Sequence, residues 1–193
     1  SWLPTGETTS TITGLCAGNY FGTVEDANGC ISTQSVTISE PAVLSVTVST
    51  TSVTCNGGCD GTATATASGG SGSYTYLWNP GGQTTSSITG LCAGSYTLGV
   101  TDANGCVVNN FFSITEPFVL QTNITNTPPS CYGGCDGTAT SNPIGGTGAY
   151  TFLWSNGQTT STATGLCAGT HTLTLSDANG CSITQTTLLV APS

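Results

Sequence analysis

The chain has 193 residues and contains no Lys or Arg against nine Asp and Glu, so its formal net charge is −9. Without cationic side chains it cannot release counterions from a nucleic-acid backbone or hold an anionic membrane surface by charge. Phosphoryl transfer assisted by Lys or Arg, and Schiff-base chemistry on a lysine, are excluded for the same reason. We therefore expect no nucleic acid among its partners.

The cysteine content indicates an oxidising compartment. Ten cysteines recur at regular positions, which is typical of exported proteins whose small domains are held by disulfides. Hydrophobic residues make up 36% of the chain, too large a share for a disordered tail. No apolar run reaches the roughly 18 residues needed to span a bilayer, so we expect no membrane insertion. The sequence predicts an extracellular or cell-surface protein.

Long segments of the chain repeat one another. A segment that begins Gly-Leu-Cys-Ala-Gly and ends Asp-Ala-Asn-Gly-Cys recurs about every 76 residues. Its copies lie at 14–30, 90–106 and 165–181. Proline interrupts strands, so we place repeat boundaries at Glu40–Pro41 and Glu116–Pro117. The predicted units are the second half of a repeat (1–41, the half-repeat), a complete repeat (42–117, the central repeat) and another complete repeat (118–193, the C-terminal repeat). We expect the chain to be a piece of a longer array.

Alternating apolar residues indicate short strands through each repeat. In the central repeat, in chain order, we expect strands at Val43–Val48, Thr62–Ala67, Tyr74–Trp78 and Tyr96–Val100. Turn signals separate them at Gly69–Gly70, Asn79–Gly82 and Asp102–Gly105. About seven strands per repeat, without helices, predict an all-β fold of tandem immunoglobulin-like β-sandwich repeats. Because such small domains bury little core, we expect disulfides to staple them into a rod-like array.

The single histidine has a structural interpretation. Leu91–Tyr96 resembles the corner of sandwich domains at which a Tyr hydroxyl bonds to nearby backbone. Tyr20 occupies the same position in the half-repeat and His171 in the C-terminal repeat. We interpret His171 as a replacement for the corner tyrosine. The central repeat then has no His base for a Ser or Cys nucleophile, so we predict no catalytic residues and no enzyme activity.

Two kinds of polar site remain as candidates. The Asp-Ala-Asn-Gly turns offer oxygen ligands for calcium at Asp102, Asn104, Asp177 and Asn179. The interpretation that we favour is that each Asp caps its own turn, so we predict no cofactor. Asn123-Ile124-Thr125 is a sequon, which makes Asn123 a candidate for glycosylation.

Four motifs in fixed order resemble a known family. They are Thr-Cys-Asn-Gly-Gly-Cys-Asp-Gly-Thr-Ala at 54–63, Gly-Ser-Tyr-Thr-Tyr-Leu-Trp at 72–78, Thr-Gly-Leu-Cys-Ala-Gly-Ser-Tyr at 89–96 and Asp-Ala-Asn-Gly-Cys at 102–106. Together they resemble the SprB-type repeat, found in tandem in large surface adhesins of gliding Bacteroidota that are exported by the type IX secretion system. The resemblance implies an extracellular Ig-like repeat with no catalytic residues to carry over.

The residues themselves leave the disulfide pairing partly open. Cys92 and Cys106 flank a strand of about seven residues, roughly 20 Å long, so they should not pair with each other. The resemblance implies Cys55–Cys106 with Cys59–Cys92, since the family keeps the first and last of these cysteines, and likewise Cys131–Cys181 with Cys135–Cys167. The swapped pairing and a local Cys55–Cys59 bond remain alternatives, whereas the spacing is not that of a zinc ribbon.

Two further cysteines have no evident partner in the chain. The expected partners of Cys16 and Cys30 would lie in the half of their repeat that precedes residue 1. We expect these two thiols to be free, to pair with each other or to bond to another chain.

The sequence therefore predicts a structural repeat segment of an extracellular adhesin or filament. Its expected partners are neighbouring repeats or identical chains in a polymer, including strand complementation of the half-repeat 1–41. The alternative is a glycan- or ice-binding module that uses repeated Thr and aromatic faces, with a glycan surface as its partner.

Overall fold

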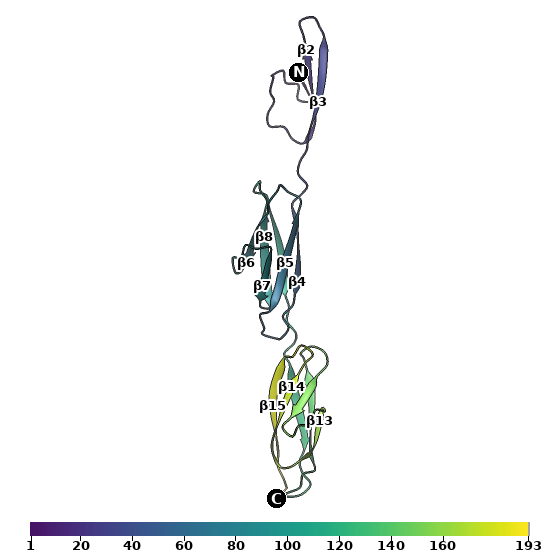
Figure 1. The fold of residues 1–193 in the computed structure, drawn as a ribbon, viewed down its shortest axis with the longest axis vertical. Coiled ribbons are helices and arrows are strands. Elements are labelled where there is room, and N and C mark those ends of the chain that lie inside the picture. The colour runs from purple at the N-terminus through teal and green to yellow at the C-terminus, as the bar shows by residue number, and fades with distance from the viewer. Residues whose placement is uncertain (193) are drawn as a thin grey trace.

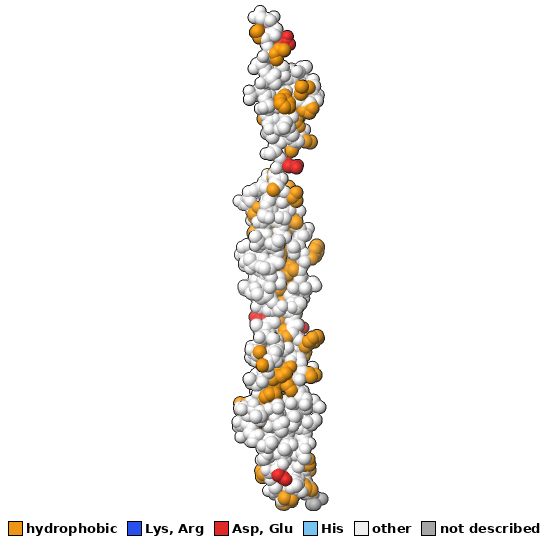
Figure 2. Space-filling view, turned by 90° about the vertical axis from the view of Figure 1, so that its right-hand side faces the viewer, with side chains coloured by type: hydrophobic (Ala, Val, Ile, Leu, Met, Phe, Trp, Pro, Cys, Tyr) orange, Lys and Arg blue, Asp and Glu red, His pale blue; other side chains and the backbone are white. Residues whose placement is uncertain are grey.

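The computed structural model describes residues 1–192, and these form a rod in which the half-repeat, the central repeat and the C-terminal repeat lie end to end (Figure 1). All regular structure in this range is β-strand, as predicted. No helix in the described residues is long and apolar enough to cross a membrane. Figure 2 shows acidic side chains as separate groups spaced along the rod, with no Lys or Arg among them.

The central repeat, residues 42–117, is a sandwich of two three-stranded antiparallel sheets. Its first sheet has the order β4-β5-β7 and its second the order β6-β8-β9. The strands are β4 (Ser45–Thr51), β5 (Gly61–Ser68), β6 (Thr75–Asn79), β7 (Ser87–Leu91), β8 (Gly94–Thr101) and β9 (Val107–Ile114). The fold class is the predicted one, with six strands in this range where about seven were expected.

The C-terminal repeat has the same arrangement over its described part, 118–192. One sheet has the order β10-β11-β13 and the other the order β12-β14-β15. The strands are β10 (Gln121–Thr127), β11 (Gly137–Ile144), β12 (Thr151–Trp154), β13 (Thr162–Leu166), β14 (Gly169–Ser176) and β15 (Ser182–Leu189). The two repeats thus agree strand by strand, as the sequence periodicity predicts.

Each core is built around one tryptophan between the two sheets. Trp78 is fully buried, and its indole Nε1 donates to the Thr85 carbonyl at 2.7 Å, so its polar atom is satisfied. Trp154 donates in the same way to Thr160 at 2.9 Å. Small alanines on β5 and β11, such as Ala63 and Ala139, are also fully buried and let the opposite sheet approach closely. This packing explains why the strand after the first cysteines alternates Thr with Ala.

The half-repeat has one sheet in place of two. Its strands β1 (Trp2–Leu3), β2 (Gly18–Glu25) and β3 (Ile31–Ile38) correspond to the sheet β6-β8-β9 of the central repeat. Residues 1–41 contain no counterpart of β4 and β5, so one face of this sheet lacks its covering layer. Val24 is 71% exposed there, whereas Val100, one period later, is fully buried. The half-repeat therefore leaves core positions open to solvent.

Candidate functional site

A hydrogen-bonded corner fixes one cysteine in every unit. The Tyr96 hydroxyl donates to the Cys92 carbonyl at 2.9 Å, and Tyr20 donates to Cys16 at 3.0 Å. His171 Nε2 lies 2.9 Å from the Cys167 carbonyl. The histidine therefore takes the structural position of the corner tyrosine, as predicted, and it holds the backbone of Cys167.

The corner cysteines of the two complete repeats are bonded within their own repeat. The structure joins Cys59 to Cys92 and Cys135 to Cys167, which are the pairs that the family resemblance implied. Each bond ties the loop that follows the first strand to the corner that precedes β8 or β14. It closes a loop of 33 residues in the central repeat and of 32 in the C-terminal repeat. The corner and the bond together fix the end of each sandwich that points toward the next unit.

The other cysteine of this loop is held by an aspartate. In the loop 54–60, the backbone N–H of Thr54 donates to Asp60 Oδ1 at 2.9 Å, and the Thr54 hydroxyl donates to Asp60 Oδ2. Both bonds lower the pKa of Asp60 below its usual value, and the bond from the Thr54 hydroxyl has the larger effect. Gly58 N–H closes the loop onto the Cys55 carbonyl at 2.9 Å. Cys55 is thereby presented at the downstream end of the central repeat.

The Asp-Ala-Asn-Gly-Cys turn lies at the opposite, upstream end of each repeat. Asp177 Oδ1 accepts from the backbone N–H groups of Asn179 at 3.0 Å and Cys181 at 2.9 Å, while Oδ2 accepts from Thr147 at 2.8 Å. Gly180 has φ of 82°, a conformation that glycine adopts readily. The turn therefore holds Cys181 in a defined position at the junction.

Asp102 caps the equivalent turn of the central repeat. It accepts from Asn104 at 3.0 Å, Cys106 at 2.8 Å and Ser71 at 2.9 Å. Burial, the largest single influence, opposes ionisation, but the bonds from Cys106, Ser71 and Asn104 together hold the pKa of Asp102 below its usual value. This arrangement fits the turn-cap interpretation that we favoured over calcium binding.

The calcium candidates do not converge on a common centre. The Asn104 side chain donates to Ser71 Oγ at 2.8 Å, and Asn179 donates to the Thr54 carbonyl at 3.0 Å, so both amides turn their NH₂ groups toward other acceptors. Within residues 1–192, no three His, Cys, Asp or Glu side chains cluster as metal ligands. Asn123, the sequon residue, is exposed on the edge strand β10.

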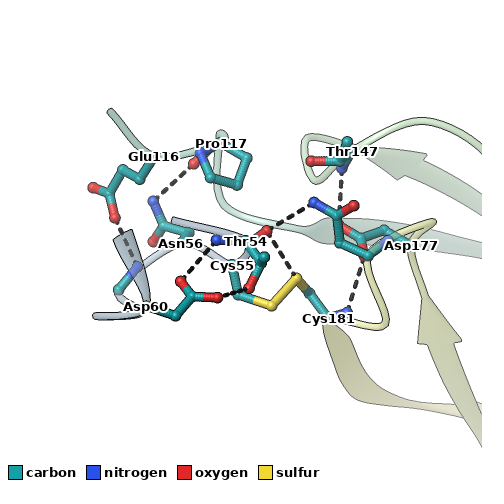
Figure 3. Close-up of a disulfide and its surroundings, with 11 residues drawn as sticks. Thr54, Cys55, Asn56, Asp60, Glu116, Pro117, Thr147, Asp177 and Cys181 are labelled. Carbon is teal, nitrogen blue, oxygen red and sulfur yellow. Dashed lines mark hydrogen bonds between the residues drawn. A yellow bond between two sulfur atoms is a disulfide. The ribbon is translucent and has the colours of Figure 1, made fainter. Parts of the chain in front are cut away.

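A disulfide crosses the junction between the two complete repeats (Figure 3). Cys55 of the central repeat is bonded to Cys181 of the C-terminal repeat, 126 residues away, with 5.7 Å between their Cα atoms. Asn179 Nδ2 donates to the Thr54 carbonyl at 3.0 Å across the same junction. The Cys181 sulfur also lies 3.4 Å from that carbonyl, a contact without a hydrogen bond because a disulfide sulfur carries no proton. The two repeats are therefore covalently fixed end to end.

The segment that connects the repeats is bound to the same cysteine loop. Asn56 Nδ2 donates to the Pro117 carbonyl at 3.0 Å, and Gly57 N–H donates to Glu116 Oε2 at 2.7 Å. A hollow of about 400 Å³ lies beside the bridge and is lined by Cys55, Pro117 and Cys181 among other residues. The Glu-Pro boundary is thus a segment anchored on the upstream repeat.

The structure corrects two of the implied disulfides. Cys55–Cys106 and Cys131–Cys181 were expected within repeats, yet Cys55 is bonded to Cys181. The physical reason is position: Cys55 lies at the downstream end of the central repeat and Cys106 at its upstream end, beside Glu40 and Pro41. The Asp-Ala-Asn-Gly-Cys cysteine of one repeat therefore meets the first loop cysteine of the repeat before it.

The free thiols among the described residues are Cys16, Cys30, Cys106 and Cys131, and all four are exposed. The staggered pairing accounts for Cys30, Cys106 and Cys131, whereas Cys16 is a corner cysteine whose equivalents Cys92 and Cys167 are bonded within their own repeat. Cys106 would require the first loop of a complete repeat upstream, and Cys131 the Asp-Ala-Asn-Gly-Cys turn of a repeat downstream. A signal for this pairing is present in the sequence: Cys55 and Cys59 share one loop, whereas Cys92 and Cys106 lie at opposite ends of a strand, so one of the latter pair has no partner within reach.

Comparison with protein families gives matches to the SprB repeat at residues 47–83 and 123–159. The chain contains SprB repeats. Each match lies inside one of the two sandwiches and covers the first cysteine loop and the tryptophan strand. SprB repeats are modules of cell-surface adhesins, so the chain is a segment of adhesin-type repeats, and the disulfides agree with an extracellular protein.

No curated protein matches the chain. Among solved structures, the chain is similar to the C-terminal 282-residue fragment of intimin in complex with the intimin-binding domain of the translocated intimin receptor. The identity is 16% and the TM-score 0.39, over 78% of this chain. The aligned region spans 64% of that fragment.

Proposed function

We propose that the chain is a load-bearing structural segment of an extracellular adhesin or filament, displayed on the cell surface after export by the type IX route. Its units are the half-repeat 1–41 and the complete repeats 42–117 and 118–193. The observation that carries the proposal is the disulfide Cys55–Cys181, because a covalent bond between successive repeats serves to fix a rod and has no role in catalysis. Because the chain has no Lys or Arg, salt bridges from these side chains cannot hold successive repeats together.

The bridge has a direct mechanical consequence. When a bridged chain is pulled from its ends, the force passes from Cys55 to Cys181 through the sulfurs, and the chain between them is shielded. That segment spans 126 residues, which at about 3.5 Å per extended residue amounts to about 440 Å of hidden length. A tether of this kind resists extension without relying on the stability of each sandwich.

Single-molecule stretching of the oxidised chain tests this function. We expect the fully stretched oxidised chain to be shorter than the reduced chain by about 440 Å, since 126 residues are bypassed. The variant Cys55→Ser without reductant should be about 210 Å longer than the oxidised parent, because Cys59–Cys92 and Cys135–Cys167 still bypass 33 and 32 of the 126 residues. Cys16→Ser, which removes an unbonded thiol, should behave like the parent chain. Equal lengths of the oxidised parent and Cys55→Ser would refute a load-bearing bridge, because reduction alone also opens the two disulfides inside the repeats.

The partners that we propose are other repeats of the same kind. The uncovered face of the half-repeat exposes Val24 where the central repeat buries Val100 under the sheet β4-β5-β7. A hairpin with the sequence pattern of β4 and β5 would cover it by strand addition. Labelling of intact cells with an antibody against the chain tests its location. Signal without permeabilisation is expected, and signal only after permeabilisation would contradict surface display.

A further inference from the structure

Five asparagines in the chain are followed directly by glycine. The pairs lie at 28–29, 56–57, 104–105, 156–157 and 179–180, and all five asparagines are exposed. In such a pair the backbone nitrogen of the glycine can attack the side-chain carbonyl carbon of the asparagine, because glycine has no Cβ to hinder the approach. The reaction expels ammonia and forms a cyclic imide. It requires a base, since the glycine nitrogen attacks only after it has lost its proton.

Four of the five pairs hold this proton in a bond to a backbone carbonyl. The glycine N–H donates to the carbonyl of Asp26 at 3.0 Å, of Asp102 at 3.0 Å, of Trp154 at 2.8 Å and of Asp177 at 3.1 Å. The carbonyl oxygen of one amide is too weak a base to take the proton from another amide. These four bonds therefore keep the glycine nitrogen unreactive.

The pair Asn56-Gly57 differs from the other four because its glycine N–H faces a carboxylate. Gly57 N–H donates to Glu116 Oε2 at 2.7 Å, a distance at which a carboxylate can act as a general base. The reacting amide is also held in place, since Asn56 Nδ2 donates to the Pro117 carbonyl at 3.0 Å (Figure 3).

The surroundings of this pair are open. Glu116 is exposed, and apart from the chain neighbours of Gly57 no heavy atom lies within 4 Å of the position that a Cβ on this glycine would occupy. The loop therefore leaves room for the imide ring and gives water access to it.

We propose that Asn56 is a modification site, at which the chain deamidates itself with Glu116 as the general base. The Glu116 carboxylate takes the proton of Gly57 N–H, and the nitrogen attacks Asn56 Cγ. The Cγ–Nδ2 bond then breaks, and the proton on Glu116 leaves with the amide group as ammonia. Water opens the imide at either carbonyl and yields aspartate or isoaspartate, so one water is consumed and one ammonia is released.

The modification changes the bridged junction. The product carboxylate has no N–H to donate to Pro117, and it adds a negative charge to the loop that Glu116 contacts. Isoaspartate also adds a methylene group to the backbone next to Cys55. The C-terminal repeat lacks the site, because Tyr132 stands in place of Asn56. Its loop keeps the same backbone, with φ of 77° at Gly133 against 75° at Gly57, so the shape of the loop does not require an asparagine.

The test compares the five pairs within one chain. The oxidised chain is incubated at neutral pH in heavy-oxygen water and digested with pepsin at acid pH, and the peptides are analysed by mass spectrometry. We expect Asn56 to take up the label at least ten-fold faster than each of the other four asparagines, with isoaspartate among its products. In the reduced chain in denaturant the five rates should converge, because the bonds that distinguish the pairs are lost.

The role of the carboxylate is tested by Glu116→Gln, which removes the base but keeps an oxygen that can accept from Gly57 N–H. Labelling of Asn56 should slow at least ten-fold. The matched control is Glu40→Gln at the other Glu-Pro boundary, which should leave the rate unchanged. An unchanged rate in Glu116→Gln, or a rate at Asn56 no higher than at the other four pairs, overturns the proposal. The same digest reports Cys55–Cys181 independently, so either result leaves the load-bearing role in place.

The consequence for the junction is tested by Asn56→Asp, which introduces one of the products directly. We expect the thiol–disulfide equilibrium of Cys55–Cys181 to shift about two- to five-fold toward reduction, because the bond to Pro117 is lost. Asn156→Asp adds the same charge in the turn after β12 and keeps Oδ1 as the acceptor for Gln158 N–H, so it should leave the equilibrium unchanged. Equal equilibria in the two variants would overturn the effect on the junction.

Discussion

The two junctions of the rod differ in what holds them. Between the complete repeats, the disulfide Cys55–Cys181 is joined by the side-chain bond from Asn179 to Thr54, and the connecting segment is anchored on the Cys55 loop. Between the half-repeat and the central repeat, no disulfide and no hydrogen bond joins residues 1–41 to 42–117 within the described chain. At the bridged junction, the upstream repeat supplies the loop that carries Cys55. The half-repeat 1–41 has no such loop, and only the backbone connects it to the central repeat.

The largest loss of stability is expected when the disulfide inside the central repeat, Cys59–Cys92, is removed. Cys59 lies in the same loop as Cys55, so this disulfide also supports the junction. Cys92→Ser opens the 33-residue loop closed with Cys59 and should destabilise the repeat by about 4 kcal/mol in the chain-entropy model. Hydrogen exchange followed by mass spectrometry, with global unfolding in denaturant, measures the loss by segment. We expect it in residues 42–117 and little change in the C-terminal repeat.

The matched variant Cys167→Ser should reverse this pattern, because it opens the equivalent loop of the C-terminal repeat. Cys16→Ser provides the control, as it removes an exposed thiol without a bond. Unchanged protection of the central repeat in Cys92→Ser would contradict the view that its internal disulfide supports the junction.

A smaller loss of stability is expected at acid pH. The folded-state pKa values of Asp60 and Asp102 are lowered, so their contribution to stability is complete above the unfolded pKa of about 3.9 and is lost as pH falls through the lower folded values. The central repeat should lose stability in the window below about pH 4. Thermal melts across this window measure it, and Asp102→Asn should make the profile shallower.

The difference between the two junctions predicts a difference between the Asp102 and Asp177 turns. Asp177→Asn should loosen its turn less than Asp102→Asn does, because the disulfide and the Asn179 bond also hold the turn at Asp177. Glu25→Gln in the half-repeat is the control, as it lies outside the central repeat. Equal exchange rates in the turns of the two Asn variants would mean that the bridge adds no local order.

The smallest effect is expected from the two bonds that anchor the connecting segment. Asn56→Tyr with Glu116→Ala introduces the residues found one repeat later, Tyr132 and Ala191. Loss of these exposed bonds should weaken the junction by about 1 kcal/mol, which shifts the thiol–disulfide equilibrium of Cys55–Cys181 about five-fold toward reduction. Redox titration with mapping of that peptide pair measures the shift. An unchanged equilibrium would show that the segment does not support the bridge.

Much of the fold was readable from the sequence because it is local. Alternating Thr and Ala predicted the strand that became β5, the period predicted matching sandwiches, and the position of His171 predicted a bond to nearby backbone, which the structure places at the Cys167 carbonyl. The turn chemistry of Asp102 was also readable, since an Asp that caps its own turn needs only neighbouring N–H groups.

The bridge between repeats was missed because it is not local. The family resemblance, applied within a single repeat, implied Cys55–Cys106, although these residues lie at opposite ends of one sandwich. The correct partner lies 126 residues from Cys55 and becomes close only when two repeats stack end to end. Sequence periodicity predicts the repeats, but it does not state which end of one meets which end of the next.

The partner of Cys55 is the most direct test of this account. The oxidised chain, digested with pepsin at acid pH without reduction and analysed by mass spectrometry, should yield a peptide pair that joins Cys55 to Cys181, together with pairs for Cys59–Cys92 and Cys135–Cys167. A digest in which Cys55 is instead joined to Cys106, and Cys181 to Cys131, would contradict a covalent junction and return each repeat to the status of an independent unit.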